Sequence, residues 1–368
     1  MSQDADAIVI GAGIVGAACA HALAEAGLDV LVLDDHRGGA TAAGMGHLVV
    51  MDDNPAELAL SQHSLATWRA WSRAMPADCA WHPCGTLWLA ANAEEMAAAE
   101  DKRQRLQAHG VDCTLIDAPA LQRLEPALRP GLHGALQVGG DGALYAPNAA
   151  RWLLARQGAR IRVQASSVVA LEEPCVRLAD GTRRQAPVLL LANGIHATTL
   201  CPGLPIRPKK GQLLITDRYP GTVQHQLVEL GYVTSAHHST GPSVAFNVQP
   251  RPTGQLLIGS SRQFDERSST VDTAMLAQML ERAVSYLPGL GALNAIRTWT
   301  GLRAATPDSL PLLGPHPRRP GLWLAVGHEG LGITTAPASA QLLAAHICRS
   351  TPELDPAPYL AQRFGALA

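Results

Sequence analysis

The sequence predicts an α/β protein, α+β overall, in which a parallel-sheet domain is interleaved with a second domain built on an antiparallel sheet. The chain opens with a strand, a glycine turn, a helix and a second strand, which is how a parallel βαβ unit begins. Between residues 205 and 265, short apolar runs alternate with clusters of Pro, Gly and Ser, as in an antiparallel sheet. The 368 residues exceed what one core usually supports, and no tandem repeat or low-complexity linker divides the sequence.

Apolar patterns predict the elements of the first half in order. A strand at 7–10 and an alanine-rich helix to about residue 26 precede a second strand at 30–33. Apolar residues then recur at helical spacing from 55 to about 75, and an Ala, Glu and Lys-rich helix is expected around 94–109. We expect both of these helices to cover the first sheet.

The second half is predicted to be rich in strands. Short runs between 160 and 192 predict strands, with Asp180 and Gly181 at a hairpin turn. The runs QLLITD, YVTS, SVAFNV and QLLIGSS predict the antiparallel sheet of the second domain. A helix near 272–286, a strand over LWLAV and a last helix to about Arg349 complete the chain.

Composition and charge limit the class of partner. Hydrophobic residues make up 47% of the chain and charged residues 16%, so large cores can form. The formal net charge is only -2 and Lys and Arg are scattered, which argues against nucleic acid and anionic membranes as partners. No signal peptide and no apolar stretch near the roughly 20 residues of a transmembrane segment is evident, so we expect a cytoplasmic protein that binds a small molecule.

The cysteine and histidine patterns indicate neither a disulfide framework nor a metal site. The seven cysteines are widely spaced and never form C-x-x-C, so reduced, mostly buried thiols are expected. The pair His237 and His238 has no carboxylate or cysteine nearby at ligand spacing. We therefore expect no bound metal.

A dinucleotide fingerprint follows the first strand. Gly11, Gly13 and Gly16 form G-x-G-x-x-G at the start of the first helix, and Asp34 ends the next strand. The glycines permit a tight turn and close approach of a pyrophosphate to the helix N-terminus, while Asp34 would accept hydrogen bonds from ribose hydroxyls. A glycine turn without a ligand is the alternative, but the complete series of elements argues against it. We predict a Rossmann-type domain whose dinucleotide also contacts Ile14, Val15 and Asp35.

The fingerprint alone does not separate NAD from FAD, because both carry an adenosine diphosphate moiety. Three further small-residue segments lie at 38–47, 192–194 and 327–332. The first could lie flat against a large ring system or form a flexible surface loop. The last leads into the final helix, whose N-terminus could stabilise negative charge on a reduced flavin. A nicotinamide enzyme would leave the second and third segments without a purpose.

Taken in order, these segments resemble the D-amino-acid oxidase and glycine oxidase family of FAD enzymes over essentially the whole chain. IVIGAGIVG with VLVLDD is similar to the family's FAD-binding start, and GATAAGMGH to its flavin-contacting loop. VVALE, LLLANG, RPKKGQLL, QPRPTGQLLIGSS, GLRAATPDSLPLLGP and LAVGHEGLGITTAP follow in the family's order. We expect a Rossmann-type FAD-binding domain of residues 1–80, 140–200 and 298–368, interleaved with a substrate-binding domain of residues 81–139 and 201–297.

The resemblance also implies how the cofactor is held. The chain lacks the cysteine that tethers flavin in the related sarcosine oxidases, and the nearest candidate, Cys348, lies at the end of the last helix. Non-covalent FAD is therefore expected. Besides the fingerprint, the residues expected to contact it are Thr41, Ala42, Ala43, Gly44, Met45, Gly46, His47, Val168, Val169, Ala192, Asn193, Gly194, Gly301, Arg303, Gly327, His328, Glu329, Gly330, Leu331, Gly332, Ile333 and Thr334.

Arg303 matches the family's carboxylate-binding arginine and is the main catalytic candidate. A guanidinium group can bind a carboxylate through two parallel hydrogen bonds, which lysine cannot do. The alternative is a structural salt bridge with Asp308. Lys209 and Lys210 precede a strand and are interpreted as solvated, although one of them could face the flavin.

Five other residues are candidates for the site. His47 and His328 lie in the two proposed flavin loops and could act in catalysis, although a histidine in a glycine loop is often structural. Tyr232, Phe246 and Asn247 lie on the domain expected to cover the flavin and are candidate substrate contacts. Packing within the sheet would explain an aromatic residue there equally well.

Within the family, ATAAGMGHLVVMDD is most similar to the D-hydroxyproline dehydrogenases. This implies oxidation of cis-4-hydroxy-D-proline, or a similar D-proline, to the pyrroline carboxylate by hydride transfer from Cα to flavin N5. Electrons would pass to a quinone or protein acceptor, and an oligomer or heteromer is left open. The alternatives are a glycine, sarcosine or D-amino-acid oxidase that forms hydrogen peroxide and, in another class, a flavin-binding subunit or tRNA-modifying flavoprotein.

Overall fold

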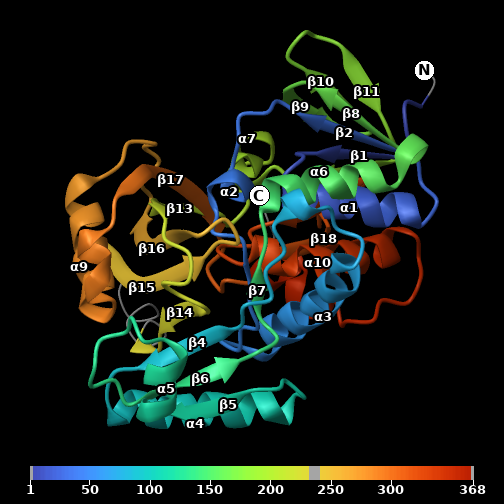
Figure 1. Ribbon diagram of the computed structural model, residues 1–368. Coiled ribbons are helices and arrows are strands. Elements are labelled where there is room, and N and C mark those ends of the chain that lie inside the picture. The colour runs from blue at the N-terminus through green and yellow to red at the C-terminus, as the bar shows by residue number, and fades with distance from the viewer. Residues whose placement is uncertain (1–2, 232–240, 366–368) are drawn as a thin grey trace.

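The computed structural model of the protein describes residues 3–231 and 241–365. Figure 1 shows two lobes, and the chain passes between them more than once. The first lobe holds a six-stranded sheet and the second an eight-stranded sheet. The mixed α/β class predicted from the sequence is confirmed.

The sheet of the first lobe is mostly parallel. Its strands are β1 (Ala7–Ile10), β2 (Val30–Asp34), β8 (Ile161–Ala165), β12 (Val188–Leu191), β18 (Leu312–Pro315) and β19 (Leu322–Val326). They lie in the order β18-β19-β12-β1-β2-β8, and only β18 and β19 pair antiparallel. β1, β2 and β12 are buried along almost their whole length, which explains their continuous apolar sequences.

Helices cover one face of this sheet. They are α1 (Ile14–Glu25), α6 (Ala146–Arg156) and α10 (Gly332–Ile347), and α3 (Pro55–Ser72) packs against α10. Trp68 on α3 is fully buried, and its indole Nε1–H donates to the carbonyls of Ile333 at 3.0 Å and Thr334 at 3.1 Å. This tryptophan therefore fixes α3 against the start of α10.

A small antiparallel sheet and a short helical segment cover the other face. The elements are β9 (Val168–Glu172), β10 (Cys175–Leu178), β11 (Arg183–Gln185), η3 (Gly194–His196) and α7 (Ala197–Leu200). The predicted turn between β10 and β11 is confirmed, with Gly181 at a φ of 84° and Asp180 Oδ1 accepting from Thr182 N at 2.9 Å.

The eight strands of the second lobe come from two distant parts of the chain. They are β4 (Thr86–Ala90), β5 (Thr114–Asp117), β6 (Gly134–Val138), β13 (Arg207–Arg218), β14 (Gln226–Glu229), β15 (Ser243–Pro250), β16 (Gln255–Phe264) and β17 (Ala295–Ala305). Their order is β17-β13-β16-β15-β14-β4-β6-β5, and β14 pairs parallel with β4. The sheet is therefore mixed, although its other pairs are antiparallel as expected. The predicted strand YVTS begins at Tyr232 and lies outside the described residues.

The outer helices of the second lobe are α4 (Ala93–Ala108), α5 (Ala118–Leu124) and α9 (Thr273–Tyr286). α4 packs against β4, β5 and β6. The expectation that this helix covers the first sheet was therefore wrong, because α4 lies against the strands at one end of the second sheet instead.

The remaining elements are short. They are α2 (Ala40–Ala43), β3 (His47–Leu48) and β7 (Gly142–Ala143), with the single turns η1 (Ala77–Cys79), η2 (Gly158–Arg160), η4 (Pro288–Ala292), η5 (Ala357–Tyr359) and η6 (Ala361–Phe364). β3 and β7 pair antiparallel. The boundary predicted at residue 298 falls inside β17, whose pairing with β13 places residues 298–305 in the second sheet.

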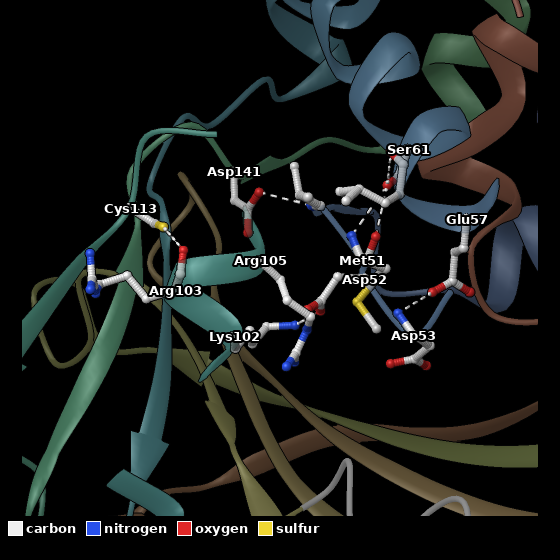
Figure 2. A network of polar contacts seen from close by, with 12 residues as sticks. Met51, Asp52, Asp53, Glu57, Ser61, Lys102, Arg103, Arg105, Cys113 and Asp141 are labelled. Atoms are coloured by element: carbon white, nitrogen blue, oxygen red, sulfur yellow. Dashed lines mark hydrogen bonds and ion pairs between the residues drawn. The ribbon is translucent and has the colours of Figure 1, made fainter. Parts of the chain in front are cut away.

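A buried ion pair joins the segment after β3 to the second lobe (Figure 2). The Lys102 ammonium on α4 contacts the Asp52 carboxylate, and both side chains are almost completely buried. Arg105 Nε lies 3.1 Å from the other oxygen of Asp52 but is half exposed. Lys102 also lies 4.6 Å from the centre of the Trp88 ring. These contacts fix the position of the chain segment between β3 and α3.

Replacing Asp52 by Asn should destabilise the protein strongly, because it leaves the Lys102 ammonium buried without a carboxylate. We expect the free energy of unfolding to fall by about 3 to 5 kcal/mol, measured by urea denaturation. Arg105→Ala is the matched control and should cost less than about 1 kcal/mol, since that partner is exposed to solvent. Equal effects of the two substitutions would contradict this account of the ion pair.

Candidate functional site

The fingerprint turn is packed so tightly that only glycine fits at two of its positions. Gly11 has a φ of 109°, and a Cβ there would lie 2.7 Å from the carbonyl oxygen of Ala192. A Cβ on Gly16 would lie 2.0 Å from the carbonyl oxygen of Gly11. Ala192 ends the apolar run VLLLANG, so two predicted cofactor segments meet directly at this turn.

The end of β2 and the start of α2 lie beside the same turn. Asp34 accepts hydrogen bonds from the backbone N–H groups of Ala12 at 2.7 Å and His36 at 2.8 Å. The N–H of Ile14, at the start of α1, donates to Thr41 Oγ1 at 2.9 Å. The predicted flavin-contacting loop is therefore in contact with the fingerprint helix.

The acid after Asp34 connects this region to β9. Asp35 Oδ2 accepts from Ser167 Oγ at 2.7 Å, immediately before Val168 and Val169. Burial raises the pKa of Asp35, but the hydrogen bonds from Ser167 and from the backbone of Arg37 outweigh it and lower that pKa overall. The carboxylate therefore stays ionised beside the predicted adenine-contacting strand.

A cavity of about 560 Å³ lies between the two lobes. Both lobes and the connecting segments contribute to its walls. The predicted residues that line it are Ala43, Gly44, Met45, His47, Asn247, Gly301, Arg303, Glu329, Gly330 and Leu331. The structure thus brings together the flavin loop at 40–47, the loop before α10 and the strand that carries Arg303.

Two glycines let β17 approach its neighbours at this cavity. A Cβ on Gly301 would lie 2.5 Å from the Cβ of Ala43 in α2. A Cβ on Gly211 in β13 would lie 2.6 Å from Nη1 of Arg303. The guanidinium group of Arg303 therefore lies across the backbone of β13, where any side chain would displace it.

Arg303 lies at the cavity wall and forms no ion pair with Asp308 in the described part of the chain. Its Nη1–H donates to the carbonyl of Ser261 at 3.2 Å. Asp308 instead binds Arg363, with Arg363 Nε 2.6 Å from the Asp308 carboxylate. The structural salt bridge considered as the alternative is therefore absent from the described residues, and Arg303 faces the cavity.

Lys209 and Lys210 are buried rather than solvated, so their interpretation as a solvated pair was wrong. Lys209 Nζ lies 2.6 Å from Glu329 Oε1, and both residues line the cavity. Burial alone would raise the pKa of Glu329, but the positive charges of Lys209 and Arg303 lower it to about 2. Glu329 is therefore a carboxylate that pairs with Lys209 and lies near two further cations, Arg303 and Arg262.

His47 lies in a buried polar network at another wall of the cavity. Its Nε2 is 3.0 Å from Asn247 Nδ2, and its Nδ1 contacts the side-chain oxygen of Gln226. Burial lowers the pKa of His47 to about 4. The imidazole is therefore neutral at physiological pH.

Other candidates lie elsewhere. His328 does not line the cavity: its Nε2 lies 3.2 Å from Ser339 Oγ on α10, and burial lowers its pKa to about 3. Phe246 is fully buried in the core of the second lobe and stacks on Tyr286 at 4.4 Å between ring centres, so it is not a cavity residue. Tyr232, His237 and His238 lie outside the described residues.

The cavity also includes residues that sequence reasoning missed, notably Glu57, Asp53 and Trp88. Burial raises the pKa of Glu57 to about 8, so its carboxyl group is largely protonated at neutral pH. Asn54 is the N-cap of α3, and its Oδ1 accepts a hydrogen bond from Glu57 N at 2.9 Å. The pattern N-P-A-E predicts this cap, but nothing in it indicates that Glu57 reaches a cavity.

The family model described as FAD dependent oxidoreductase matches residues 6–346 of the chain. The chain belongs to this family. The resemblance found in the sequence is therefore confirmed at the level of the family, and the cofactor of this FAD-dependent oxidoreductase is FAD.

Individual relatives of this oxidoreductase have several names. Glycine oxidase of Pseudomonas putida is 27% identical and aligns over 96% of this chain and 97% of its own. One of the subunits of the opine oxidase of Rhizobium meliloti is 26% identical over 99% of this chain and 98% of its own. The crystal structure of L-proline dehydrogenase from P. horikoshii superposes with a TM-score of 0.87 at 22% identity, covering 99% of this chain and 98% of that one. The last of these comparisons supports the fold.

The residues of the fingerprint region fit FAD. Gly11 and Gly16 are buried and let the turn pack tightly at the start of α1, where the partly exposed N-cap Gly13 provides no side-chain cap. α10 also begins without a side-chain cap, directly after the cavity residues Glu329, Gly330 and Leu331. Gly13 and Asp34 would hold the adenosine diphosphate part, and the 40–47 and 327–334 segments the ring system. FAD, when bound, supplies a hydride acceptor.

Two other classes of site have no support in the described part of the chain. Residues 3–231 and 241–365 contain no cluster of three or more His, Cys, Asp or Glu side chains that could hold a metal ion. Within the same ranges, none of the helices combines the length and apolar character that crossing a bilayer requires.

Gly13→Val should abolish retention of FAD while the protein remains folded. Even the Cβ at this position would lie 3.0 Å from Thr41 Oγ1, and the rest of the side chain would occupy the approach to the helix N-terminus. The measurement is flavin absorbance per protein after gel filtration, with circular dichroism as the test of folding. Gly289→Val, at an exposed glycine with open space around it, is the control and should keep its flavin. Normal flavin content in Gly13→Val would refute this placement of the pyrophosphate.

Proposed function

We propose that this oxidoreductase dehydrogenates a small amino acid or secondary amine, with a hydride leaving Cα for flavin N5. The observation that carries the proposal is Arg303, whose guanidinium group lines the interlobe cavity beside the loops assigned to FAD. A guanidinium group at the wall of a cavity can bind the carboxylate of a ligand, because its N–H groups lie in one plane and form two parallel, charge-assisted hydrogen bonds. The glycine oxidase and L-proline dehydrogenase relatives act, by their names, on amino acids.

The charges beside Arg303 support a substrate with one carboxylate. Glu329 compensates Lys209, so these three side chains carry a net positive charge of about one, and Arg262 at the cavity wall adds to it. Arg303 is partly buried, and a bound carboxylate would give its charge a partner. The role of Arg303 is thus to bind and orient the substrate rather than to move a proton.

The most specific substrate we propose is cis-4-hydroxy-D-proline. Residues 40–53 carry the similarity to D-hydroxyproline dehydrogenases, and many of them, including Met45, His47 and Met51, line the cavity. Apolar side chains such as Leu213 and Val228 suit a small ring. A polar group, at Asn247 or His47, would then bind the ring hydroxyl.

The electron acceptor we propose is a quinone or a protein carrier. The relative from Rhizobium meliloti is named as one of the subunits of an opine oxidase, which is compatible with a second protein component here. A glycine or sarcosine oxidase that reduces oxygen to hydrogen peroxide is the competing interpretation, and glycine oxidase of Pseudomonas putida is a relative over nearly the whole chain.

Anaerobic mixing with candidate substrates tests the proposed activity. We expect D-proline and cis-4-hydroxy-D-proline to bleach the flavin, and turnover to be faster with an artificial dye than with dissolved oxygen. The hydroxylated substrate should be preferred by roughly 10-fold or more if its hydroxyl is bound by a buried polar group. Rapid peroxide formation with glycine or sarcosine, and no bleaching by either proline, would replace this proposal with the oxidase alternative.

Arg303→Ala should retain FAD but lower kcat/KM by a factor on the order of 10², because the carboxylate loses a desolvated, charge-assisted contact. Arg303→Lys should recover little, since an ammonium lacks the planar fork. Arg207→Ala is a matched control, because Arg207 lines the same cavity but is largely exposed and paired with Asp265. Flavin reduction as fast as in the wild type at low substrate concentration, in both Arg303 variants, would place the carboxylate elsewhere.

A further inference from the structure

The polar network around His47 has two members whose hydrogen-bonding roles are fixed by their chemistry. The backbone oxygen of Gly142 can only accept, and it receives the Gln226 Nε2–H at 2.8 Å. The guanidinium group of Arg251 can only donate, and its Nη1 lies 2.9 Å from Gln249 Oε1. Gln226 and Gln249 are both fully buried. Neither amide can therefore be turned over without placing two acceptors or two donors together.

These two anchors fix the proton on His47. Because Gln226 donates to Gly142, its side-chain oxygen faces His47 Nδ1, and it also accepts from Gln249 Nε2 at 2.9 Å. An oxygen at that place requires a hydrogen on Nδ1, so Gln249 Nε2, which also lies 3.2 Å from Nδ1, directs its hydrogen to Gln226 Oε1 at 2.9 Å. His47 is neutral, so its Nε2 carries no hydrogen and accepts from Asn247 Nδ2 at 3.0 Å.

The consequence appears at Asn247. With its amide nitrogen directed at His47, its Oδ1 is left buried and without a hydrogen-bond partner among the described residues. Asn247 lines the cavity, but its Oδ1 has almost no exposed surface, so a ligand reaches this oxygen only when the side chain turns toward the cavity. A buried acceptor without a partner costs free energy, and a ligand can recover that cost only by offering an N–H or O–H group.

We propose that Asn247 Oδ1 is a specificity-determining acceptor for an N–H or O–H donor on the substrate, and that His47 and Gln226 are positioning residues that fix its direction. The inference rests on the proposed function, in that Arg303 binds the carboxylate of the same substrate. It assigns His47 no proton transfer. It also excludes a substrate that presents only an acceptor, such as an ether oxygen, at this point of the wall.

Two pairs of unreactive ligands test the proposal in the FAD-loaded protein. Pyrrole-2-carboxylate and furan-2-carboxylate have the same shape and charge, but the first carries a ring N–H and the second a ring oxygen. cis-3-Hydroxycyclopentanecarboxylate and its methyl ether make the same comparison for a hydroxyl. Dissociation constants are measured by calorimetry and by the change in the flavin spectrum.

In the wild type we expect the donor of at least one pair to bind about 10-fold or more tightly than its partner. Tighter binding of pyrrole-2-carboxylate than of furan-2-carboxylate would show that Asn247 accepts from the substrate amine. Tighter binding of the hydroxylated ligand than of its methyl ether would show that Asn247 accepts from the ring hydroxyl. Asn247→Leu should bring the ratio close to one.

His47→Phe tests positioning separately from packing. Without His47 the amide of Asn247 can turn over and offer its N–H instead, so the ratio should fall while the affinity for unsubstituted cyclopentanecarboxylate stays within about 3-fold. A purely structural role would weaken all ligands together and leave the ratio unchanged, which would overturn the role of His47. Gln226→Met provides a second variant with the same expected fall in ratio.

The outcomes separate this inference from the proposed function. Equal affinities within both pairs in the wild type, with cyclopentanecarboxylate still bound and its binding lost in Arg303→Ala, would overturn the role of Asn247 alone. Failure of every carboxylate to bind would overturn the proposed function, and the inference would fall with it.

Discussion

The site depends on a cluster of three charged side chains between the two lobes: Lys209, Arg303 and Glu329. Lys209 and Arg303 are register partners on β13 and β17, so two cations of one sheet are necessarily side by side. Glu329 comes from the loop after β19 in the other lobe and compensates one of them. The Lys209–Glu329 ion pair therefore joins the two lobes, and positive charge remains beside it on Arg303 and on Arg262, which lines the same cavity.

Glycine makes this meeting sterically feasible. Arg303 lies over Gly211, and β17 approaches α2 at Gly301 with almost no space for a side chain. The same principle acts at the nucleotide turn, where Gly11 and Gly16 bring α1 against the end of β1. At both places the absence of a side chain lets neighbouring elements pack more closely than any other residue would allow.

The parts of the fold that local patterns determine could be predicted from the sequence. β1, the fingerprint turn, α1 and β2 are consecutive, so strand periodicity and glycine spacing suffice to place them. β14 and the burial of Lys209 depend on pairing between distant segments, and no local pattern carries that information. Phe246 is a different case: it precedes Asn247 in one strand, and the usual alternation of side chains already predicts opposite sides of the sheet for the two, as the structure shows.

The parallel pairing of β14 with β4 bears on how the chain acquires its structure during synthesis. The second sheet is completed only when residues 207–305 join residues 86–138, and the first sheet only when β18 and β19 join strands made much earlier. Neither lobe is encoded by one continuous stretch. Strands that are synthesised early therefore keep unpaired edges until their partners are synthesised. Such non-local pairing makes this topology slow to fold, and the unpaired edges need protection until the last strands leave the ribosome.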